Sequence, residues 1–433
     1  MKNSLNNILP DSFTGAIMAI EGIQDAAVLL NGPTGCKFYH GALSDGQLPR
    51  VVSLNPLKFI EEFYFGQPRV PATYIDENDY IFGSSDKLEK ILPVVAGKGH
   101  SLIAIINSPG AALIGDNLNR FIDNASLSIP CVAIENTGFF GMITDGYKSA
   151  LMATLEHLSF TNEAIIEKSV NLIGISIFHK YWEESINELR NLLSLCGIKV
   201  LCTLCADTTI NEMMNLPRAQ CNIIIHEEYG EEVALWLKDK FKTPCVTPSE
   251  GAPIGFLSTE KWILEAASAV NADPTPALQT ISDSRYKVFS TLSRYNSITG
   301  LPKGATFSIN ADPSVAYPLT KWLYSYLGMM PIAITSTHVG ATKIDKKLTN
   351  FLEEINCSNA REINIPDVIS DIIFADGNTI AMMQGKEITR VGIEIALPSS
   401  GYINIIPRTL LGTNGALYIL EQIVNGLFGV GKR

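Results

Sequence analysis

Charged residues are scarce in this sequence: Asp, Glu, Lys and Arg make up 18% of 433 residues, against 46% for hydrophobic residues. That balance speaks against an intrinsically disordered chain, which combines high charge with few apolar residues. The sequence has no run of Lys or Arg, and its formal net charge is −11, so no nucleic-acid partner is expected. Apolar stretches long enough to cross a bilayer are also missing, which predicts no membrane partner.

Two further absences narrow the location and the chemistry of the protein. The first residues, MKNSLNNILPDSF, lack the hydrophobic segment of a signal peptide. We therefore expect a cytoplasmic protein whose eight cysteines are thiols or metal ligands rather than disulfides. The segment Gly251-Ala252-Pro253-Ile254-Gly255 is not followed by Gly-Lys-Ser/Thr, so no ATP site is expected in this chain.

What the sequence does contain is an alternation of short apolar segments with longer amphipathic ones. Strands are predicted at 26–30, 102–106, 131–134, 170–175, 200–203, 222–225, 305–309, 332–335, 372–374 and 393–395. Between them, segments such as 183–195 place apolar residues on one face at helical spacing. The order strand-helix-strand-helix-strand is typical of a parallel sheet with helices on both of its faces.

This alternation recurs in three blocks along the chain. It predicts an α/β protein of three Rossmann-like parallel-sheet domains around a central cleft, with residues 1–168, 169–300 and 301–433 as the domains. Segment 271–277 contains two prolines and is predicted to be a connecting turn. A last helix over 415–427 is expected to pack back on an earlier domain.

Cys36 ends a glycine- and proline-containing turn, Leu30-Asn31-Gly32-Pro33-Thr34-Gly35-Cys36, that follows a short apolar strand. Gly allows backbone angles that other residues avoid and Pro restricts its own, so this turn should be rigid. A thiol held in this way can serve as a metal ligand. The alternative is a small apolar residue packed under a loop. The turn by itself does not decide between the two.

Further motifs follow Cys36 in order along the chain. They are Glu77-Asn78-Asp79-Tyr80-Ile81-Phe82-Gly83, Asp86-Lys87-Leu88, Leu113-Ile114-Gly115-Asp116-Asn117, Pro407-Arg408 and Gly412-Thr413-Asn414-Gly415-Ala416. Each motif is weak alone, but the ordered set resembles the nitrogenase component 1 family across nearly the whole chain. That family includes the subunits of the molybdenum–iron protein, their cofactor-assembly paralogues, the dark-operative protochlorophyllide reductase and the nickel-sirohydrochlorin reductive cyclase.

The resemblance implies an iron–sulfur cluster on the first domain, for which this chain supplies one thiol. A typical subunit of the family provides three cysteines from separate loops, and Cys36 matches the middle one. The first position falls near Asp11 and Ser12, and the third falls on Pro109, which cannot bind iron. Because a cubane cluster usually takes four thiolates, one chain cannot enclose it. A paralogous subunit, or a second copy contributing its own Cys36, would complete the site. The alternative is that the cluster has been lost.

A second group of candidate residues lies in the middle domain. Cys202 and Cys205 form a C-x-x-C pair at one predicted strand end, and His226 and Glu227 follow the next strand. Ligands gather at the carboxyl ends of parallel strands, so these four residues are predicted to line the cleft and to bind a second metal or a tetrapyrrole. In the nitrogenase α subunit the position of Glu227 is the cysteine that holds the catalytic cofactor, so the same mode of binding is not expected here.

The resemblance predicts a subunit of the catalytic component of a two-component, nitrogenase-like reductase. A separate ATP-hydrolysing iron–sulfur protein would deliver electrons through a cluster at a subunit interface near Cys36. The substrate, a tetrapyrrole or another small molecule that is hard to reduce, would bind in the cleft. Two alternatives stay open. One is a scaffold on which a metal cofactor is assembled or carried, and the other is a structural partner subunit without a cluster of its own.

Overall fold

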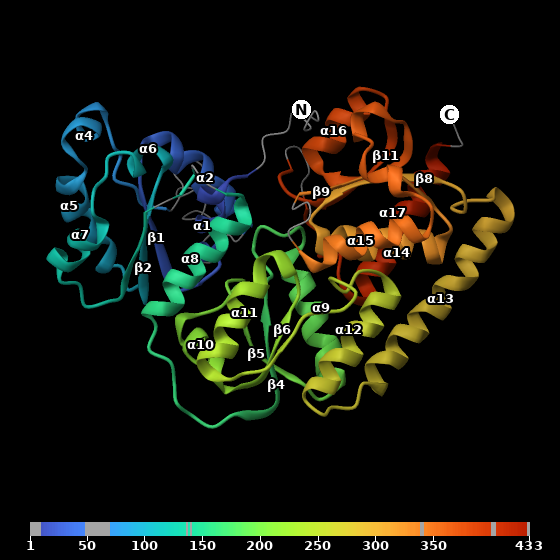
Figure 1. Cartoon of the computed structure of the whole chain (residues 1–433), viewed down its shortest axis with the longest axis horizontal. Helices are drawn as coiled ribbons and strands as arrows, with labels where there is room; N and C mark the ends of the chain where they lie inside the picture. Colours follow the sequence, from blue (N-terminus) through green and yellow to red (C-terminus); the bar gives the residue numbers. More distant parts are fainter. Residues whose placement is uncertain are drawn as a thin grey trace.

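The computed structural model describes residues 10–47, 70–135, 137–138, 141–337, 342–399 and 404–430. It contains three parallel sheets, each packed against helices on both faces (Figure 1). The predicted α/β architecture of three parallel-sheet domains is therefore confirmed, while the proposed domain boundaries stay a prediction. None of the helices in these ranges combines the length and the apolar composition that crossing a bilayer requires.

The first sheet has the strand order β1-β2-β3. Its strands are β1 (Ala26–Asn31), β2 (Leu102–Asn107) and β3 (Cys131–Ile134). The helices of this part of the chain are α1 (Ser12–Glu21), α2 (Thr34–Gln47), α4 (Glu77–Phe82), α5 (Ser85–Ala96), α6 (Pro109–Ala112), α7 (Leu118–Ala125) and α8 (Ile143–His157). Consecutive residues of β1 point to opposite faces of the sheet, and both faces are covered. Val28 and Leu29 therefore belong to two different hydrophobic clusters.

The second sheet has the strand order β5-β4-β6-β7. Its strands are β4 (Ile166–Ile173), β5 (Lys199–Thr203), β6 (Ala219–Ile224) and β7 (Cys245–Val246). The helices are α9 (Trp182–Leu195), α10 (Ile210–Met214), η1 (Leu216–Arg218), α11 (Glu227–Phe241), α12 (Gly255–Ala269) and α13 (Thr275–Thr299). The predicted apolar face of α9 packs into the core through Leu189, Leu192 and Leu193.

The third sheet has the strand order β11-β10-β8-β9. Its strands are β8 (Thr306–Ala311), β9 (Met330–Ser336), β10 (Ser370–Asp376) and β11 (Thr389–Ala396). The helices are α14 (Pro313–Leu327), α15 (Lys343–Glu354), η2 (Ser358–Arg361), η3 (Ile365–Asp367), α16 (Gly377–Gly385) and α17 (Gly412–Val430).

The last helix, α17, packs on α9 and α12. Its first turn is held there by Glu188 of α9, whose carboxylate accepts hydrogen bonds from the backbone N–H groups of Thr413 (2.8 Å) and Asn414 (3.0 Å). A carboxylate at a helix N-terminus satisfies otherwise unpaired N–H groups and favours the helix dipole. The C-terminal part of the chain is thereby fastened to the second domain.

Candidate functional site

Cys36 lies in the first turn of α2, just after the carboxyl end of β1, and is half-buried. The predicted turn is therefore shorter than expected, because the helix begins at Thr34. Burial raises the pKa of the Cys36 thiol; a hydrogen bond with the Ser108 side chain opposes this effect, and the nearby Asp11 carboxylate adds to it. The thiol thus faces two of the loops in which the family resemblance placed cluster ligands.

The loops that carry these ligand positions converge around Cys36. The backbone N–H of Gly138 donates to Oγ of Ser12 at 2.8 Å. A Cβ atom on Gly138, which has a φ of +85°, would lie 2.2 Å from Cγ of Pro109, so a side chain has no room there. Asp11, Ser12, Cys36 and Pro109 are thus gathered in one place, and only Cys36 among them carries a thiol.

A four-thiolate cluster does not fit this chain by itself. Over the ranges that the structure describes, no three His, Cys, Asp or Glu side chains are grouped so that they could hold a metal ion. The Asp11 carboxylate is already engaged as the N-cap of α1, where it accepts from the backbone N–H of Thr14 at 3.0 Å. Within the described ranges this part of the chain can therefore offer one thiol, that of Cys36, where a cubane cluster usually takes four thiolates.

The surface near Cys36 exposes large apolar side chains. The most exposed of those on α2, on α4 and directly after α6 are Tyr39 (80% exposed), Ile81 (73%), Phe82 (82%) and Leu113 (75%). In Figure 1 these helices lie along the upper side of the first domain, with α6 between α4 at the outer edge and α2 toward the middle of the molecule. Large apolar side chains gathered on a surface mark an interaction site in many soluble proteins.

The structure places Cys202 and Cys205 away from the cleft, between the first and second domains. Both are buried in a hydrophobic cluster that also contains α1 and α8 residues. Sγ of Cys202 lies 3.4 Å from Oγ1 of Thr208, and the backbone of Cys205 packs against Gly22 at the end of α1. Burial raises the pKa of Cys202 to about 12 and that of Cys205 well above its ordinary value. Their predicted role in cofactor binding stays a prediction.

His226 and Glu227 instead contact the third domain. Nδ1 of His226 lies 2.8 Å from Oγ of Ser314 on α14. The Glu227 carboxylate accepts a hydrogen bond of 2.9 Å from the backbone N–H of Lys343, at the start of α15. The four predicted residues thus divide into two pairs: the cysteines join the second domain to the first, and His226 and Glu227 join it to the third.

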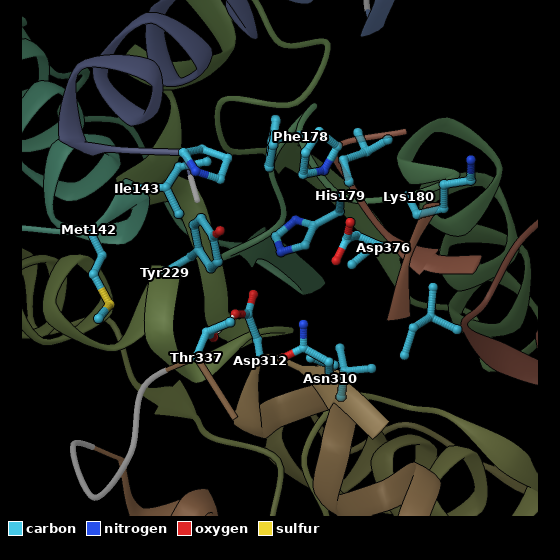
Figure 2. Close-up of a pocket in the computed structure, with 17 residues that line it drawn as sticks. Met142, Ile143, Phe178, His179, Lys180, Tyr229, Asn310, Asp312, Thr337 and Asp376 are labelled. Atoms are coloured by element: carbon cyan, nitrogen blue, oxygen red, sulfur yellow. Dashed lines mark hydrogen bonds between the residues drawn. The ribbon is translucent and has the colours of Figure 1, made fainter. Parts of the chain in front are cut away.

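A pocket lies where the three domains meet, and we call it the interdomain pocket. Its volume is about 100 Å³. Its lining consists of Pro10, Met142, Ile143, Phe178, His179, Lys180, Tyr229, Asn310, Ala311, Asp312, Val315, Thr337, Asp376, Ile395, Ala396, Leu397 and Pro398. Figure 2 shows the side chains of His179, Tyr229, Asn310, Asp312 and Asp376 around the hollow.

Strand order explains why the pocket is here. In the second sheet β4 lies between β5 and β6, and in the third sheet β8 lies between β9 and β10. Each arrangement creates a switch point, where the chain adds strands first on one side and then on the other. Ligands of open α/β sheets bind in the crevice at the carboxyl end of such a point. The loop after β4, the first turn of α11 after β6, and the ends of β8 and β10 all contribute to the interdomain pocket.

His179 presents a hydrogen-bond donor to the pocket. The backbone N–H of Ser176 donates to its Nδ1 at 2.8 Å, so in the neutral ring the proton lies on Nε2. Nε2 is buried and has no hydrogen-bond partner within the described ranges. Burial lowers the pKa of His179 to about 4, although the Asp312 carboxylate opposes the shift. The ring stacks on that of His226, with centroids 4.1 Å apart.

Lys180 and Glu394 form an ion pair in the wall of the pocket. Nζ of Lys180 lies 2.5 Å from Oε2 of Glu394, and the two side chains are 2% and 5% exposed. Burial lowers the pKa of Lys180, while the hydrogen bond and the charge of Glu394 oppose that shift. The pair joins the loop after β4 to strand β11, and therefore ties the second domain to the third.

The sequence and the fold both match known proteins. A sequence model of the family described as Nitrogenase component 1 type Oxidoreductase matches residues 12–428. The chain belongs to this family. The solved structure of nitrogenase Cp1 at pH 6.5 aligns with a TM-score of 0.80 at 15% identity, covering 100% of this chain and 96% of that chain. The three-domain fold is therefore shared with a nitrogenase.

Two curated proteins of this nitrogenase-like family show more sequence identity. The nitrogenase iron-molybdenum cofactor biosynthesis protein NifE of Clostridium pasteurianum is 26% identical over 307 residues, which cover 68% of this chain and 61% of that protein. The B subunit of the light-independent protochlorophyllide reductase of Trichormus variabilis is 30% identical over 311 residues, 66% of this chain and 59% of that protein. The chain thus spans about three fifths of the length of these relatives.

None of the site residues that the sequence analysis selected in this nitrogenase-like chain lines the interdomain pocket. His179, Asn310, Asp312 and Asp376 each lie at or shortly after the carboxyl end of a strand that was predicted correctly. The strand-end rule, which selected Cys202 and His226, would have selected them as well. What the rule lacks is the order of the strands in the sheet, and this order decides which strand ends face a crevice.

The buried carboxyl group of Glu228, next to the interdomain pocket residue Asp312, should make the stability of the protein depend on pH. Its Oε1 accepts from the backbone N–H of Ser314 at 2.6 Å, and its Oε2 is buried without a hydrogen-bond partner within the described ranges. Burial and the Asp312 carboxylate raise the pKa of Glu228 to about 8 from an ordinary value of 4.5. The unfolded chain releases this proton near pH 4.5, whereas the folded chain keeps it until about pH 8. The free energy of unfolding therefore has its full value below pH 4.5 and falls as the pH rises to about 8.

We therefore expect Glu228→Gln, which stays neutral, to gain in free energy of unfolding relative to the native protein as the pH rises from 5 to 9. Urea unfolding at a series of pH values measures this difference. Glu227→Gln is the matched control, because Glu227 is the adjacent buried carboxylate and already accepts the Lys343 N–H. Equal pH slopes for the native protein and Glu228→Gln would contradict the expectation.

Proposed function

We propose that this chain is a subunit of the catalytic component of a two-component, nitrogenase-like reductase of the cytoplasm. Its partner subunit is a paralogue or a second copy of the chain, and an ATP-hydrolysing iron–sulfur protein supplies electrons. A cluster at the subunit interface, to which Cys36 contributes one thiolate, receives them. The interdomain pocket holds the small molecule that is reduced.

One observation carries this proposal: the loops in which the family resemblance placed cluster ligands converge around Cys36, yet Asp11, Ser12 and Pro109 leave Cys36 as the one thiol among these positions, next to an apolar surface. A site that is incomplete in one chain and lies beside an exposed apolar surface fits an interface between subunits. The names of the relatives add support, because one is a subunit of a reductase and the other acts in cofactor biosynthesis.

The lone thiol also favours a second candidate, a structural partner subunit without a cluster of its own. A scaffold for cofactor assembly is the third candidate, since NifE is named for cofactor biosynthesis. Iron and sulfide content separates the candidates. The chain is purified without oxygen, alone and together with co-expressed nitrogenase-like paralogues from its genome. A reductase subunit binds iron only in the oligomer, whereas a structural partner adds none to the complex.

Replacing Phe82 by aspartate is expected to weaken assembly. Phe82 is 82% exposed at the end of α4, so the substitution leaves the core intact but puts a charge into an apolar interface. Sedimentation velocity without oxygen measures the effect as a shift from oligomer to monomer. Phe289→Asp on α13 is the control, because it changes an exposed aromatic residue on the second domain. Unchanged assembly of Phe82→Asp would place the interface elsewhere.

A further inference from the structure

Three side chains of the interdomain pocket carry hydrogen-bond donors for which the described part of the chain offers no acceptor. In His179 the donor is the N–H at Nε2. Tyr229, in the first turn of α11, is 2% exposed, and its hydroxyl makes no hydrogen bond within the described ranges. Asn310, at the end of β8, is 8% exposed, and its amide has no partner in those ranges either. A buried donor without a partner carries a desolvation penalty, which an acceptor atom of a ligand would remove.

The three donors border one hollow. The rings of His179 and Tyr229 meet edge to face, with centroids 4.7 Å apart. In Figure 2 these two side chains lie along one edge of the hollow, and the Asn310 amide points into it from the opposite edge. Burial raises the pKa of Tyr229 well above its ordinary value, and the nearby Asp312 and Glu228 carboxyl groups add to the shift. The phenol therefore keeps its proton and can donate a hydrogen bond.

The carboxylates of the lining, in contrast, already have donors. Asp376 accepts from the backbone N–H of Thr379 at 2.9 Å and from the hydroxyl of the same residue at 2.5 Å. Asp312 accepts from the hydroxyl of Thr337. Buried polar groups in folded proteins are almost always hydrogen-bonded. The groups that still need a partner in this pocket are donors, so a ligand must bring an acceptor atom.

The charges of the lining exclude a negatively charged acceptor. Asp312 and Asp376 bring two carboxylates to the hollow, and the Lys180 ammonium is already paired with Glu394. Among the described residues of the lining there is no other lysine or arginine, so a ligand carboxylate or phosphate would be repelled. An uncharged acceptor remains. A carbonyl oxygen fits best, because its two lone pairs accept two hydrogen bonds at once.

We infer that the interdomain pocket binds a compact, uncharged molecule with a carbonyl group. Its carbonyl oxygen accepts from Nε2–H of His179 and from the hydroxyl of Tyr229, and the Asn310 amide can bind a second polar atom across the hollow. The apolar side chains of Ile143 and Phe178 enclose the carbon atoms. This inference names a substrate class for the proposed reductase, and it rests on that proposal only in treating the pocket as the substrate site.

The size of the pocket agrees with such a ligand. Sites for larger ligands have volumes of about 300–1,000 Å³, whereas this pocket has about 100 Å³. A tetrapyrrole, one of the substrates considered from the sequence, is a larger ligand of that kind. The structure thus favours a compact substrate.

Three probes of nearly equal shape test the inference: acetone, isobutene and acetate. Acetone has an uncharged carbonyl oxygen, isobutene has a CH₂ group in its place, and acetate carries a negative charge. Each is titrated into the purified chain, without cluster or reductase, and binding is followed by saturation-transfer NMR of its proton signals. Saturable binding is expected for acetone and not for acetate. No saturable binding of acetone, or equally tight binding of acetate, would overturn the inference and leave the iron measurement of the proposed function unaffected.

Two variants test the hydrogen bonds to the carbonyl oxygen. Tyr229→Phe removes a hydroxyl that has no hydrogen bond in the described ranges, and His179→Phe keeps a flat ring next to His226 but has no N–H. Each variant should weaken acetone binding about fivefold, because each removes one hydrogen bond, and should leave isobutene binding unchanged. Undiminished acetone binding in both variants would overturn the inference. Equal losses for acetone and isobutene would also overturn it, because they would trace the effect to the shape of the pocket.

Tyr295→Phe is the matched control for the tyrosine variant. The Tyr295 hydroxyl is also buried without a partner in the described ranges, but this residue belongs to α13 and does not line the pocket. Tyr295→Phe should therefore bind acetone as tightly as the native protein. A loss as large as that in Tyr229→Phe would show that the effect does not come from the pocket, and would count against the inference.

Discussion

Cys36→Ala is expected to abolish the iron–sulfur absorbance of the assembled complex while leaving the fold of the chain nearly unchanged. Cys36 is half-buried in the first turn of α2, so losing its small side chain should cost only about 1 kcal/mol of stability. If its thiolate is a ligand, the loss of a metal–sulfur bond is a much larger local change. Iron and sulfide analysis and visible absorbance of the oxygen-free complex measure the effect.

Cys131→Ala is the matched control for this experiment. Cys131 is a buried thiol at the start of β3, on the opposite face of the first sheet from α1. Burial raises its pKa to about 12, and it packs among apolar side chains, with no group of metal-ligating residues around it in the described ranges. Full iron content in both variants would make Cys36 a packing residue, and the structural partner subunit would then be the better interpretation of this chain.

Lys180→Met is expected to lower the free energy of unfolding by about 3–5 kcal/mol, because it leaves the buried Glu394 carboxylate without its partner. Lys180 and Glu394 are almost completely enclosed, and Oε1 of Glu394 already has no partner within the described ranges. An isolated buried charge must be desolvated or protonated, and either costs free energy. Urea unfolding at neutral pH measures the loss.

Two further variants show whether the unpaired, buried Glu394 carboxylate causes the loss of stability in Lys180→Met. In Lys180→Met combined with Glu394→Gln the unpaired carboxylate is gone, so part of the stability should return. Lys343→Met removes one partner of the Lys343–Glu231 pair, whose lysine side chain is 74% exposed, and should cost no more than about 1 kcal/mol. A loss in Lys180→Met as small as that in Lys343→Met would contradict the expectation.

Most strands and helices could be predicted because each carries its own signal. The buried parallel strands are short apolar runs, and helices such as α9 have apolar residues at helical spacing. Helix α13 was missed: segment 271–277 was predicted as a turn, but the helix begins at Thr275 and continues to Thr299. Few of its residues are buried, so the periodic pattern that reveals a helix is weak there.

The candidate site was less predictable because it depends on how the sheets are ordered and placed. Cys202 and His226 both lie near carboxyl ends of strands in the second sheet. The switch point, however, falls between β4 and β6, so His226 reaches the third domain. Strand β5 lies on the other side of β4, where Cys202 packs toward the first domain. Local sequence patterns contain no information on this order.

The hydrophobic clusters that join the domains determine how a ligand can enter the pocket. One cluster contains residues of both the second and the third sheet, such as Leu172 and Phe307. Another contains residues of both the first and the second, such as Val28 and Ile224. A hinge motion that separated the domains would expose such a cluster to water. The free-energy cost of that exposure is about 25 cal/mol for each Å² of apolar surface. If the pocket is the substrate site of the proposed reductase, entry and exit must rely on movements of loops and side chains, and these movements would limit turnover whenever chemistry is faster.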